Sequence, residues 1–190
     1  MDKNSNTGEF SSVLAGNRRF VSKNRDYPNL VHSQNPEYVV ISCSDSRVAP
    51  SIILDAPLGT IFEIRLAGEL IDDSAIASVE FAVEKLGTGK IIILGHTNCG
   101  AVNAAIEKIT GKDTELNGTP YLEKAVHRII EGLSKEDPAR KDNTQLVKAN
   151  IEVQKLALLK SPLLKHLHHK GEIIVRGAIY DLSTGYVEFI

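Results

Sequence analysis

The sequence predicts an α/β fold, a single domain over residues 1–190 in which a mostly parallel central sheet is flanked by helices. Two observations carry this prediction. Short runs of aliphatic and β-branched residues alternate with longer segments whose apolar residues recur at helical spacing, which favours a parallel sheet covered by helices. Two of the short runs are also followed at once by cysteine, histidine and charged residues, and an open α/β sheet keeps its ligand site at the carboxyl ends of its strands.

The composition is that of a soluble globular protein, with 42% hydrophobic and 24% charged residues and a net charge of -2. So small a net charge gives no reason to expect a nucleic acid or an anionic membrane surface as a partner. Residues 1–9 contain no secretory signal, and no stretch approaches the length of a transmembrane helix. We therefore expect a cytoplasmic protein that acts on a small molecule.

The N-terminal region is predicted to be a loose tail over residues 1–8, followed by a helical arm over residues 9–24. The apolar residues of the arm recur at helical spacing: Phe10, Val13, Leu14 and Phe20. The arm precedes the sheet and does not alternate with its strands. It can therefore pack on a neighbouring subunit, and the alternative is that it covers the core of its own chain.

Five strands are expected, each a short apolar run bounded by turn residues. They span residues 38–41, 60–66, 90–94, 172–179 and 186–189. The last one follows a turn at residues 183–185 and is expected to pair antiparallel at the edge of the sheet. A strand order of 2-1-3-4 plus this edge strand places the first and third strands side by side, where the winding of the chain reverses.

Helices are expected between these strands. Asp72 can cap a helix that Gly87 ends, and the apolar residues of that helix fit one face: Ile76, Val79, Val83 and Leu86. The remaining helices are expected at positions with similar signals: after Pro50, from about Gly100, over residues 120–133, over residues 141–160 and near residues 163–170.

Two cysteines and a histidine follow two of the predicted strands. Cys43 comes directly after the first strand, and His96 and Cys99 follow the third at a turn into a helix. Two thiolates and one imidazole make a zinc site with one position left open, which is the ligand count of a catalytic metal. Cobalt or cadmium could occupy the same ligands. A disulfide is the alternative, but cytosolic thiols stay reduced, and zinc ligation is therefore favoured.

Asp45 and Arg47 follow Cys43 closely and are predicted to act as a pair. Arg47 can hold Asp45 in a bidentate, charge-assisted pair that keeps the carboxylate ionised. An ionised Asp45 can accept a hydrogen bond from a zinc-bound hydroxide and leave a lone pair of that hydroxide facing a substrate. Released by Arg47, Asp45 could become a fourth zinc ligand and close the site. An ordinary loop salt bridge is the alternative, and the neighbouring thiolate favours the catalytic role.

The segments 41–48 and 95–102, which contain these residues, resemble the paired motifs of the β-class carbonic anhydrases. The resemblance covers nearly the whole chain from about Phe10, through the segments 62–68, 78–87 and 177–182. It implies an enzyme with one Zn²⁺ per subunit that interconverts carbon dioxide and bicarbonate by means of a zinc-bound hydroxide. It also implies a homodimer or homotetramer with its sites near the subunit interface.

The resemblance assigns roles residue by residue. Cys43, His96 and Cys99 match the zinc ligands of the family. Asp45 and Arg47 match its catalytic dyad.

Four further residues match positions that bind the substrate. Gln34 matches a glutamine whose side-chain amide binds a substrate oxygen, and the backbone N–H of Gly100 matches a second donor. Phe62 and Phe81 match the apolar wall where carbon dioxide lies, contributed across the interface. Core packing is the alternative for both phenylalanines.

Two positions depart from the family pattern. Glu69 stands where the family usually has Asn, so the hydrogen bonds of that amide are not expected here. Val40 stands where the subgroup that shuts off by binding bicarbonate at a second site has Trp, although Arg65 and Tyr180 match the other residues of that site. The chain therefore resembles the constitutively open subgroup.

Two other functions fit the same residues. The zinc site could hydrolyse a carbon dioxide analogue such as carbon disulfide or carbonyl sulfide. In a non-enzymatic zinc or redox-sensing module, Asp45 would instead complete a closed site with four ligands.

Overall fold

The structure, a computed structural model, describes residues 10–23, 30–111, 118–134 and 142–190. The chain divides into two compact units, residues 1–34 and residues 35–190. The second unit is a single α/β domain that contains the five-stranded sheet, and the predicted fold class is confirmed. The predicted tail at residues 1–8 lies outside the described residues.

The first unit contains helix α1 (Ser11–Ser22), which falls within the predicted arm at residues 9–24. None of the residues of this helix is buried. The apolar side chains that were expected to share one face are all exposed: Phe10, Val13, Leu14 and Phe20. The packing of this arm on a neighbouring subunit stays a prediction.

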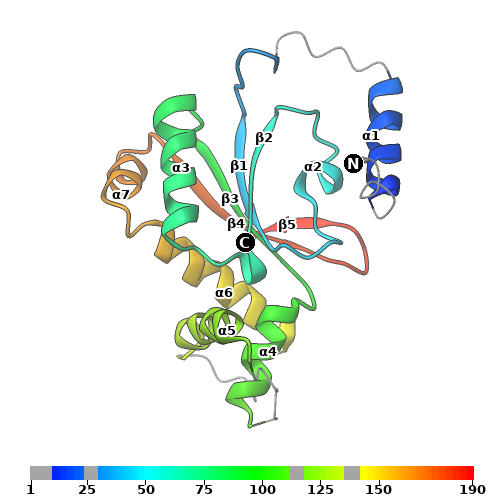
Figure 1. The fold of residues 1–190 in the computed structure, drawn as a ribbon. Coiled ribbons are helices and arrows are strands. Elements are labelled where there is room, and N and C mark those ends of the chain that lie inside the picture. The colour runs from blue at the N-terminus through cyan, green and yellow to red at the C-terminus, as the bar shows by residue number, and fades with distance from the viewer. Residues whose placement is uncertain (1–9, 24–29, 112–117, 135–141) are drawn as a thin grey trace. The chain divides into compact units, whose positions relative to one another are not determined.

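The sheet has the strand order β2-β1-β3-β4-β5, which confirms the predicted topology. The strands are β1 (Tyr38–Ser42), β2 (Ile61–Arg65), β3 (Lys90–His96), β4 (Ile174–Tyr180) and β5 (Val187–Phe189). The first four are mutually parallel, and β5 pairs antiparallel with β4 at the edge (Figure 1). Strand β3 runs two residues further than predicted, so His96 is its last residue.

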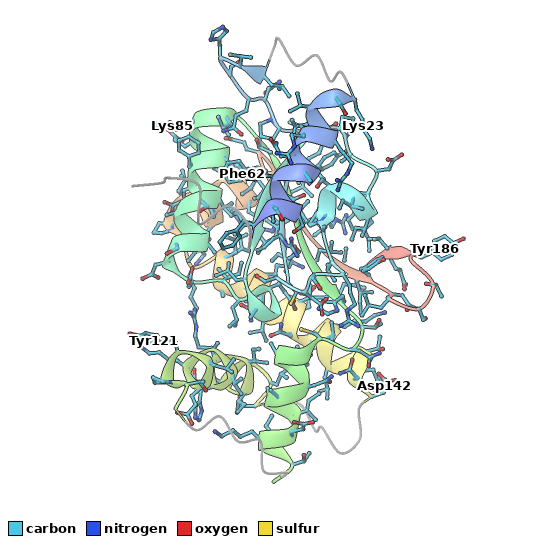
Figure 2. All side chains as sticks on the ribbon, turned by 45° about the vertical axis from the view of Figure 1, so that its right-hand side comes forward. Lys23, Phe62, Lys85, Tyr121, Asp142 and Tyr186 are labelled. Carbon is cyan, nitrogen blue, oxygen red and sulfur yellow. The ribbon has the colours of Figure 1, made fainter. Side chains whose placement is uncertain are left out.

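The α-helices of the second unit lie where they were expected, with ends that differ by up to two residues, and the 3₁₀ helix η2 was not predicted. They are α2 (Pro50–Ile53), the 3₁₀ helix η2 (Ala67–Glu69), α3 (Asp73–Leu86), α4 (Gly100–Ile109), α5 (Pro120–Gly132), α6 (Asn143–Leu158) and α7 (Pro162–His169). Asp72 accepts a hydrogen bond from Ala75 N at 2.8 Å, and Gly87 ends α3 at a left-handed φ of 72°. Asp142, labelled in Figure 2, forms a capping box with Gln145. Among the described helices, none is both long and apolar enough to span a bilayer.

The core lies mainly between the sheet and one layer of helices. Alternate strand residues, such as Ile41 and Ile93, join the buried side chains of α3, α4, α5, α6 and α7 in one large cluster. The opposite face of the sheet contributes a smaller cluster around Val40 and Leu94, which α2 covers through Ile53. The two faces of the sheet are therefore covered unequally.

Helix α6 packs directly on strands β3 and β4. A β-carbon added at Gly95 or Gly177 would come within 2.7 Å of the Ile151 side chain, so glycine permits this close approach. The approach fixes α6 beside the carboxyl end of β3, where the residues of the candidate site gather.

Candidate metal centre

The candidate site begins where two neighbouring parallel strands end. Ser42, the last residue of β1, is in register with Leu94 of β3. Cys43 therefore leaves the sheet beside the end of β3, which is His96. Cys99 is the N-cap residue of α4 and lies one short turn after His96. The topology thus brings the three predicted ligands to one edge of the sheet, as expected at a reversal of winding.

The three side chains form a buried cluster of possible ligand atoms. One sulfur or nitrogen from each of Cys43, His96 and Cys99 lies within 4.8 Å of the others, and all three residues are buried. The two Sγ atoms are 3.9 Å apart. A disulfide holds its sulfurs about 2.05 Å apart, and both cysteines are free thiols in the structure.

The geometry of this cluster fits a tetrahedral zinc ion. Two thiolates that each lie about 2.3 Å from such an ion are about 3.8 Å apart, close to the separation of the two Sγ atoms. His96 Nδ1 lies 2.9 Å from the carbonyl oxygen of Thr97, which fixes the ring. The other ring nitrogen, Nε2, is buried and has no hydrogen-bond partner among the described residues. A buried nitrogen without a partner suits a metal ligand.

The two thiols perturb each other strongly in the protein without metal. Hydrogen bonding with Cys99 lowers the pKa of Cys43 far below that of a free thiol, with smaller help from His96 and from the N–H of Gly68. The same bond, together with burial, raises the pKa of Cys99. One thiolate is therefore already favoured, and a metal that binds has to displace the proton of Cys99.

Asp45 lies at the rim of this cluster and is held by Arg47. Its oxygens Oδ1 and Oδ2 accept from Arg47 Nε at 2.9 Å and from Arg47 NH2 at 2.7 Å. Asp45 Oδ1 also accepts from the backbone N of Arg47 at 2.9 Å. These bonds hold the pKa of the Asp45 carboxyl well below its usual range. Asp45 Oδ2 lies 3.9 Å from His96 Nε2, so the ionised carboxylate faces the cluster while Arg47 keeps both of its oxygens occupied.

The loop that carries Cys43 and Asp45 is held by Arg65, the last residue of β2. Arg65 donates from Nε to the carbonyl oxygen of Cys43 at 3.3 Å and from NH2 to that of Asp45 at 2.7 Å. The sequence associated Arg65 only with the second bicarbonate site of a subgroup. Its place at the carboxyl end of the adjacent strand was the signal for this second role.

The segment between His96 and Cys99 is held from two sides. Thr97 donates from its backbone N to Tyr180 O at 3.0 Å, and its Oγ1 accepts from Leu182 N at 3.0 Å. Asn98 has a left-handed φ of 55° and donates from its backbone N to Asn143 Oδ1 at 2.9 Å. No sequence signal indicated the contact with Asn143, which lies 45 residues further along the chain.

The predicted substrate-binding residues are placed less completely. Gly100 is exposed and opens α4 directly after Cys99. Gln34 is exposed and is the last residue of the first unit, whose placement relative to the second is not determined. The roles of both residues stay predictions.

Phe62 and Phe81 lie against each other. Their ring centroids are 6.4 Å apart, and Phe81 is 49% exposed on α3, whereas Phe62 is half-buried (Figure 2). Phe62 is in register with Val39, about 13 Å along β1 from Cys43. Phe62 packs against the main core cluster, as the core-packing alternative expects, whereas Phe81 is half exposed. A contribution across an interface stays the prediction.

Comparisons with known proteins agree with the fold and the cluster. A protein-family model described as "Carbonic anhydrase" matches residues 38–187. Carbonic anhydrase 2 of Mycobacterium tuberculosis is 32% identical over 192 residues, which cover 93% of this chain and 88% of that protein. These matches place the chain among the carbonic anhydrases.

Solved structures specify the class. The Coccomyxa β-carbonic anhydrase, in complex with acetazolamide, matches with a TM-score of 0.83 and 25% identity over 97% of this chain and 87% of that one. Two tetrameric β-carbonic anhydrases of Sordaria macrospora share the fold, with a TM-score of 0.83 and 21% identity over 96% of both chains. The chain belongs to the β-class carbonic anhydrase family and is an enzyme of that family.

Proposed function

We propose that this protein catalyses the reversible hydration of carbon dioxide to bicarbonate and a proton at a zinc ion held by Cys43, His96 and Cys99. One observation carries the proposal. Two buried sulfurs and an unpaired imidazole nitrogen converge within 4.8 Å, beside a carboxylate that Arg47 holds off the cluster. Three protein ligands leave one position of a tetrahedral ion open for chemistry.

A zinc ion bound there, one per subunit, would act as a Lewis acid that lowers the pKa of water and so supplies a nucleophile near neutral pH. The residues of the chain set how strongly this happens. The thiolates of Cys43 and Cys99 offset the charge of the ion, and the site is therefore less acidifying than one built from three neutral imidazoles. Activity should accordingly rise toward alkaline pH.

Asp45 and Arg47 orient the reacting group. The ionised Asp45 carboxylate can only accept hydrogen bonds, so it fixes the direction of a hydroxyl group and leaves a lone pair for carbon dioxide. Arg47 fixes Asp45 through two parallel hydrogen bonds. The two hydrogen bonds from Arg47 support an open arrangement, in which Asp45 would accept from the reacting group and would not occupy the fourth position of the metal.

The substrate-binding part of the proposal follows the family resemblance. The side-chain amide of Gln34 and the backbone N–H of Gly100 would bind oxygens of carbon dioxide or bicarbonate. Phe62 and Phe81 would form an apolar wall in the site of a second subunit, since Phe62 lies far along the sheet from Cys43 of its own chain and Phe81 of α3 contacts Phe62. This arrangement requires at least a homodimer, and the tetrameric Sordaria structures support a homotetramer as a further possibility.

The cytoplasm is the proposed location. Oxidation of Cys43 and Cys99 to a disulfide would remove two of the three ligands, and a reducing compartment prevents it.

A stopped-flow assay with a pH indicator tests the proposed activity. Protein loaded with zinc is mixed with dissolved carbon dioxide at about pH 8.5, and the metal content of the same preparation is measured. We expect one zinc per subunit and hydration far above the background rate. Full zinc occupancy with only the background rate would reject the proposal and leave a non-enzymatic zinc module or a hydrolase of carbon disulfide or carbonyl sulfide.

A further inference from the structure

One sulfur of the metal centre accepts a hydrogen bond from a constrained turn. The backbone N–H of Gly68, within η2, donates to Cys43 Sγ at 3.4 Å. Gly68 has a left-handed φ of 66°, and a β-carbon there would lie 2.9 Å from Ile129 Cδ1 and 3.0 Å from Ala101 Cβ. Only glycine can bring its N–H to this sulfur in so close a space.

The peptide group that follows this N–H is held by an amide from α6. Asn150 Nδ2 has two hydrogens and donates both ways, to Gly68 O at 3.0 Å and to Glu69 Oε1 at 2.7 Å. Asn150 and Glu69 are both fully buried. One side-chain amide thus fixes a backbone carbonyl and the adjacent side chain together.

The orientation of that amide is fixed in turn by Gln154, one helical turn further along α6. Gln154 Nε2 donates to Asn150 Oδ1 at 3.1 Å, and Gln154 Oε1 accepts from Ile71 N at 2.9 Å. Both ends of this series are backbone groups, the N–H of Ile71 and the carbonyl of Gly68. Because a backbone N–H can only donate and a carbonyl can only accept, both amides have a single possible orientation.

Glu69 lies in an unfavourable place for a glutamate. It has a left-handed φ of 44° and no exposed surface, and its second oxygen, Oε2, has no hydrogen-bond partner among the described residues. A left-handed φ is unfavourable for a residue other than glycine, and a buried polar atom without a partner is more unfavourable still. Such costs persist where the surrounding structure uses the residue for another purpose.

We propose that Glu69 is a positioning residue for the metal centre. With Asn150 and Gln154, it holds the Gly68–Glu69 peptide so that the Gly68 N–H stays directed at the Cys43 sulfur. A hydrogen bond to a ligating thiolate withdraws charge from the sulfur and fixes its direction, and residues behind a metal ligand typically change metal affinity by 10- to 100-fold. The inference rests on the proposed function only in that it takes Cys43 as a zinc ligand.

The test compares two substitutions that keep the volume of Glu69. Glu69→Gln retains an acceptor oxygen for Asn150, whereas Glu69→Leu removes it. We expect E69L to weaken zinc binding by about 10-fold or more in competition with a chelator, and E69Q to bind zinc as the wild type does. Asn150→Ala, which removes the donor, should weaken zinc binding in the same way as E69L does.

Two measurements separate positioning from a loss of stability. Ser161→Ala removes a part-buried hydrogen bond from Ser161 Oγ, at the N-cap of α7, to Glu80 Oε1 of α3 at 2.6 Å, together with the cap bond from Leu164 N at 3.2 Å. It serves as the control for destabilisation away from the metal centre. In protein loaded with cobalt, the sulfur-to-metal charge-transfer band should move to lower energy in E69L and N150A, but not in E69Q or S161A.

Equal zinc affinity and an unmoved band in both E69L and N150A would overturn the proposal. Loss of zinc affinity in S161A as large as in E69L would also overturn it. Neither readout depends on hydration of carbon dioxide. A protein that passes this test without turning over its substrate therefore counts only against the proposed function.

Discussion

Two carboxyl groups belong to the segments that hold Cys43, Asp45 in the loop after it and Glu69 next to Gly68, whose N–H donates to its sulfur, and their surroundings give them opposite charge states. Asp45 lies at the rim, where the hydrogen bonds from Arg47 hold its pKa well below the usual range. Glu69 belongs to a buried group with Asn150 and Gln154, which we call the floor of the site. Burial raises the pKa of Glu69 to about 8 despite the hydrogen bond from Asn150. The rim therefore carries an ionised acceptor, and the floor carries a neutral group.

This difference follows from what each side has to do. A second ionised carboxylate beneath two thiolates would repel their charge, and a neutral Glu69 can hold a peptide without doing so. The rim group is proposed to accept a hydrogen bond, which needs an ionised carboxylate. The loop of Asp45 is accordingly held by exposed Arg47, whereas the floor is held by buried amides.

The largest effect is expected at the proposed zinc ligands themselves. Cys99→Ser should reduce zinc from one per subunit to a small fraction and bring hydration to the background rate, because a hydroxyl is a far poorer zinc ligand than a thiolate. Metal analysis and the stopped-flow assay measure both quantities. Ser44→Ala, an exposed change beside Cys43, should alter neither. Retention of full zinc content by C99S would show that Cys99 is not a ligand.

The next largest effect is expected at the rim. Asp45→Asn keeps the shape of the side chain but removes its charge, so zinc content should be unchanged while turnover falls by about 10²- to 10⁴-fold. Arg47→Lys keeps the positive charge but loses the parallel pair of hydrogen bonds, and its loss should be smaller. Turnover in D45N equal to that of the wild type would remove Asp45 from the mechanism and make the pair a simple loop salt bridge.

The raised pKa of Glu69 should affect how the free energy of unfolding depends on pH. The pKa of Glu69 is raised in the folded protein, so between about pH 4.5 and pH 8 the folded chain holds a proton that the unfolded chain releases. Taken by itself, this proton lowers the free energy of unfolding by several kcal/mol as the pH rises through the window. The lowered pKa of Cys43 acts in the opposite direction over much of the same range, because there the unfolded chain holds a thiol proton that the folded chain has released. Urea denaturation of the metal-free protein at several pH values therefore has to be compared with that of a variant that lacks only the Glu69 carboxyl group.

Glu69→Gln is the comparison for this slope, since it cannot ionise and shares every other titrating group with the wild type. The free energy of unfolding of E69Q, relative to that of the wild type, should increase with pH up to about pH 8 and then stay constant. A difference that does not change with pH would mean that Glu69 has an ordinary pKa.

Much of the rim and the ligand cluster could be predicted from the sequence. Cys43 and His96 each follow an apolar run at a strand end, and parallel neighbouring strands must bring such residues to the same edge. The spacing of Asp45 and Arg47 within one short loop made their contact a local property. These features depend on short stretches of chain and on a topology rule, and both can be read without coordinates.

The floor could not be predicted in this way. Asn150 and Gln154 are one helical turn apart, a spacing that indicated only a helix, and the residues that they bind lie 81 to 83 positions earlier in the chain. The sequence did show that Glu69 departs from the family, and from this we expected the hydrogen bonds of an amide to be missing. The structure shows that a carboxyl oxygen accepts from Asn150 instead, because α6 brings a donor to it.

The smallest effects are expected at Arg65, which belongs to the segment that joins rim and floor. Its side chain holds the carbonyls of Cys43 and Asp45, and three residues later Gly68 holds the Cys43 sulfur. Arg65→Ala should leave zinc bound but let the rim loop shift, and turnover should fall by about 10-fold, since small misplacements of a reacting group are costly.

Asn143→Ala is the matched change at the other loop, where Thr97 keeps its own two hydrogen bonds, and its loss of turnover should be smaller still. Stopped-flow turnover at full zinc occupancy ranks the two variants, and a larger loss in N143A would mean that the segment between His96 and Cys99, rather than the rim loop, limits the alignment of the site.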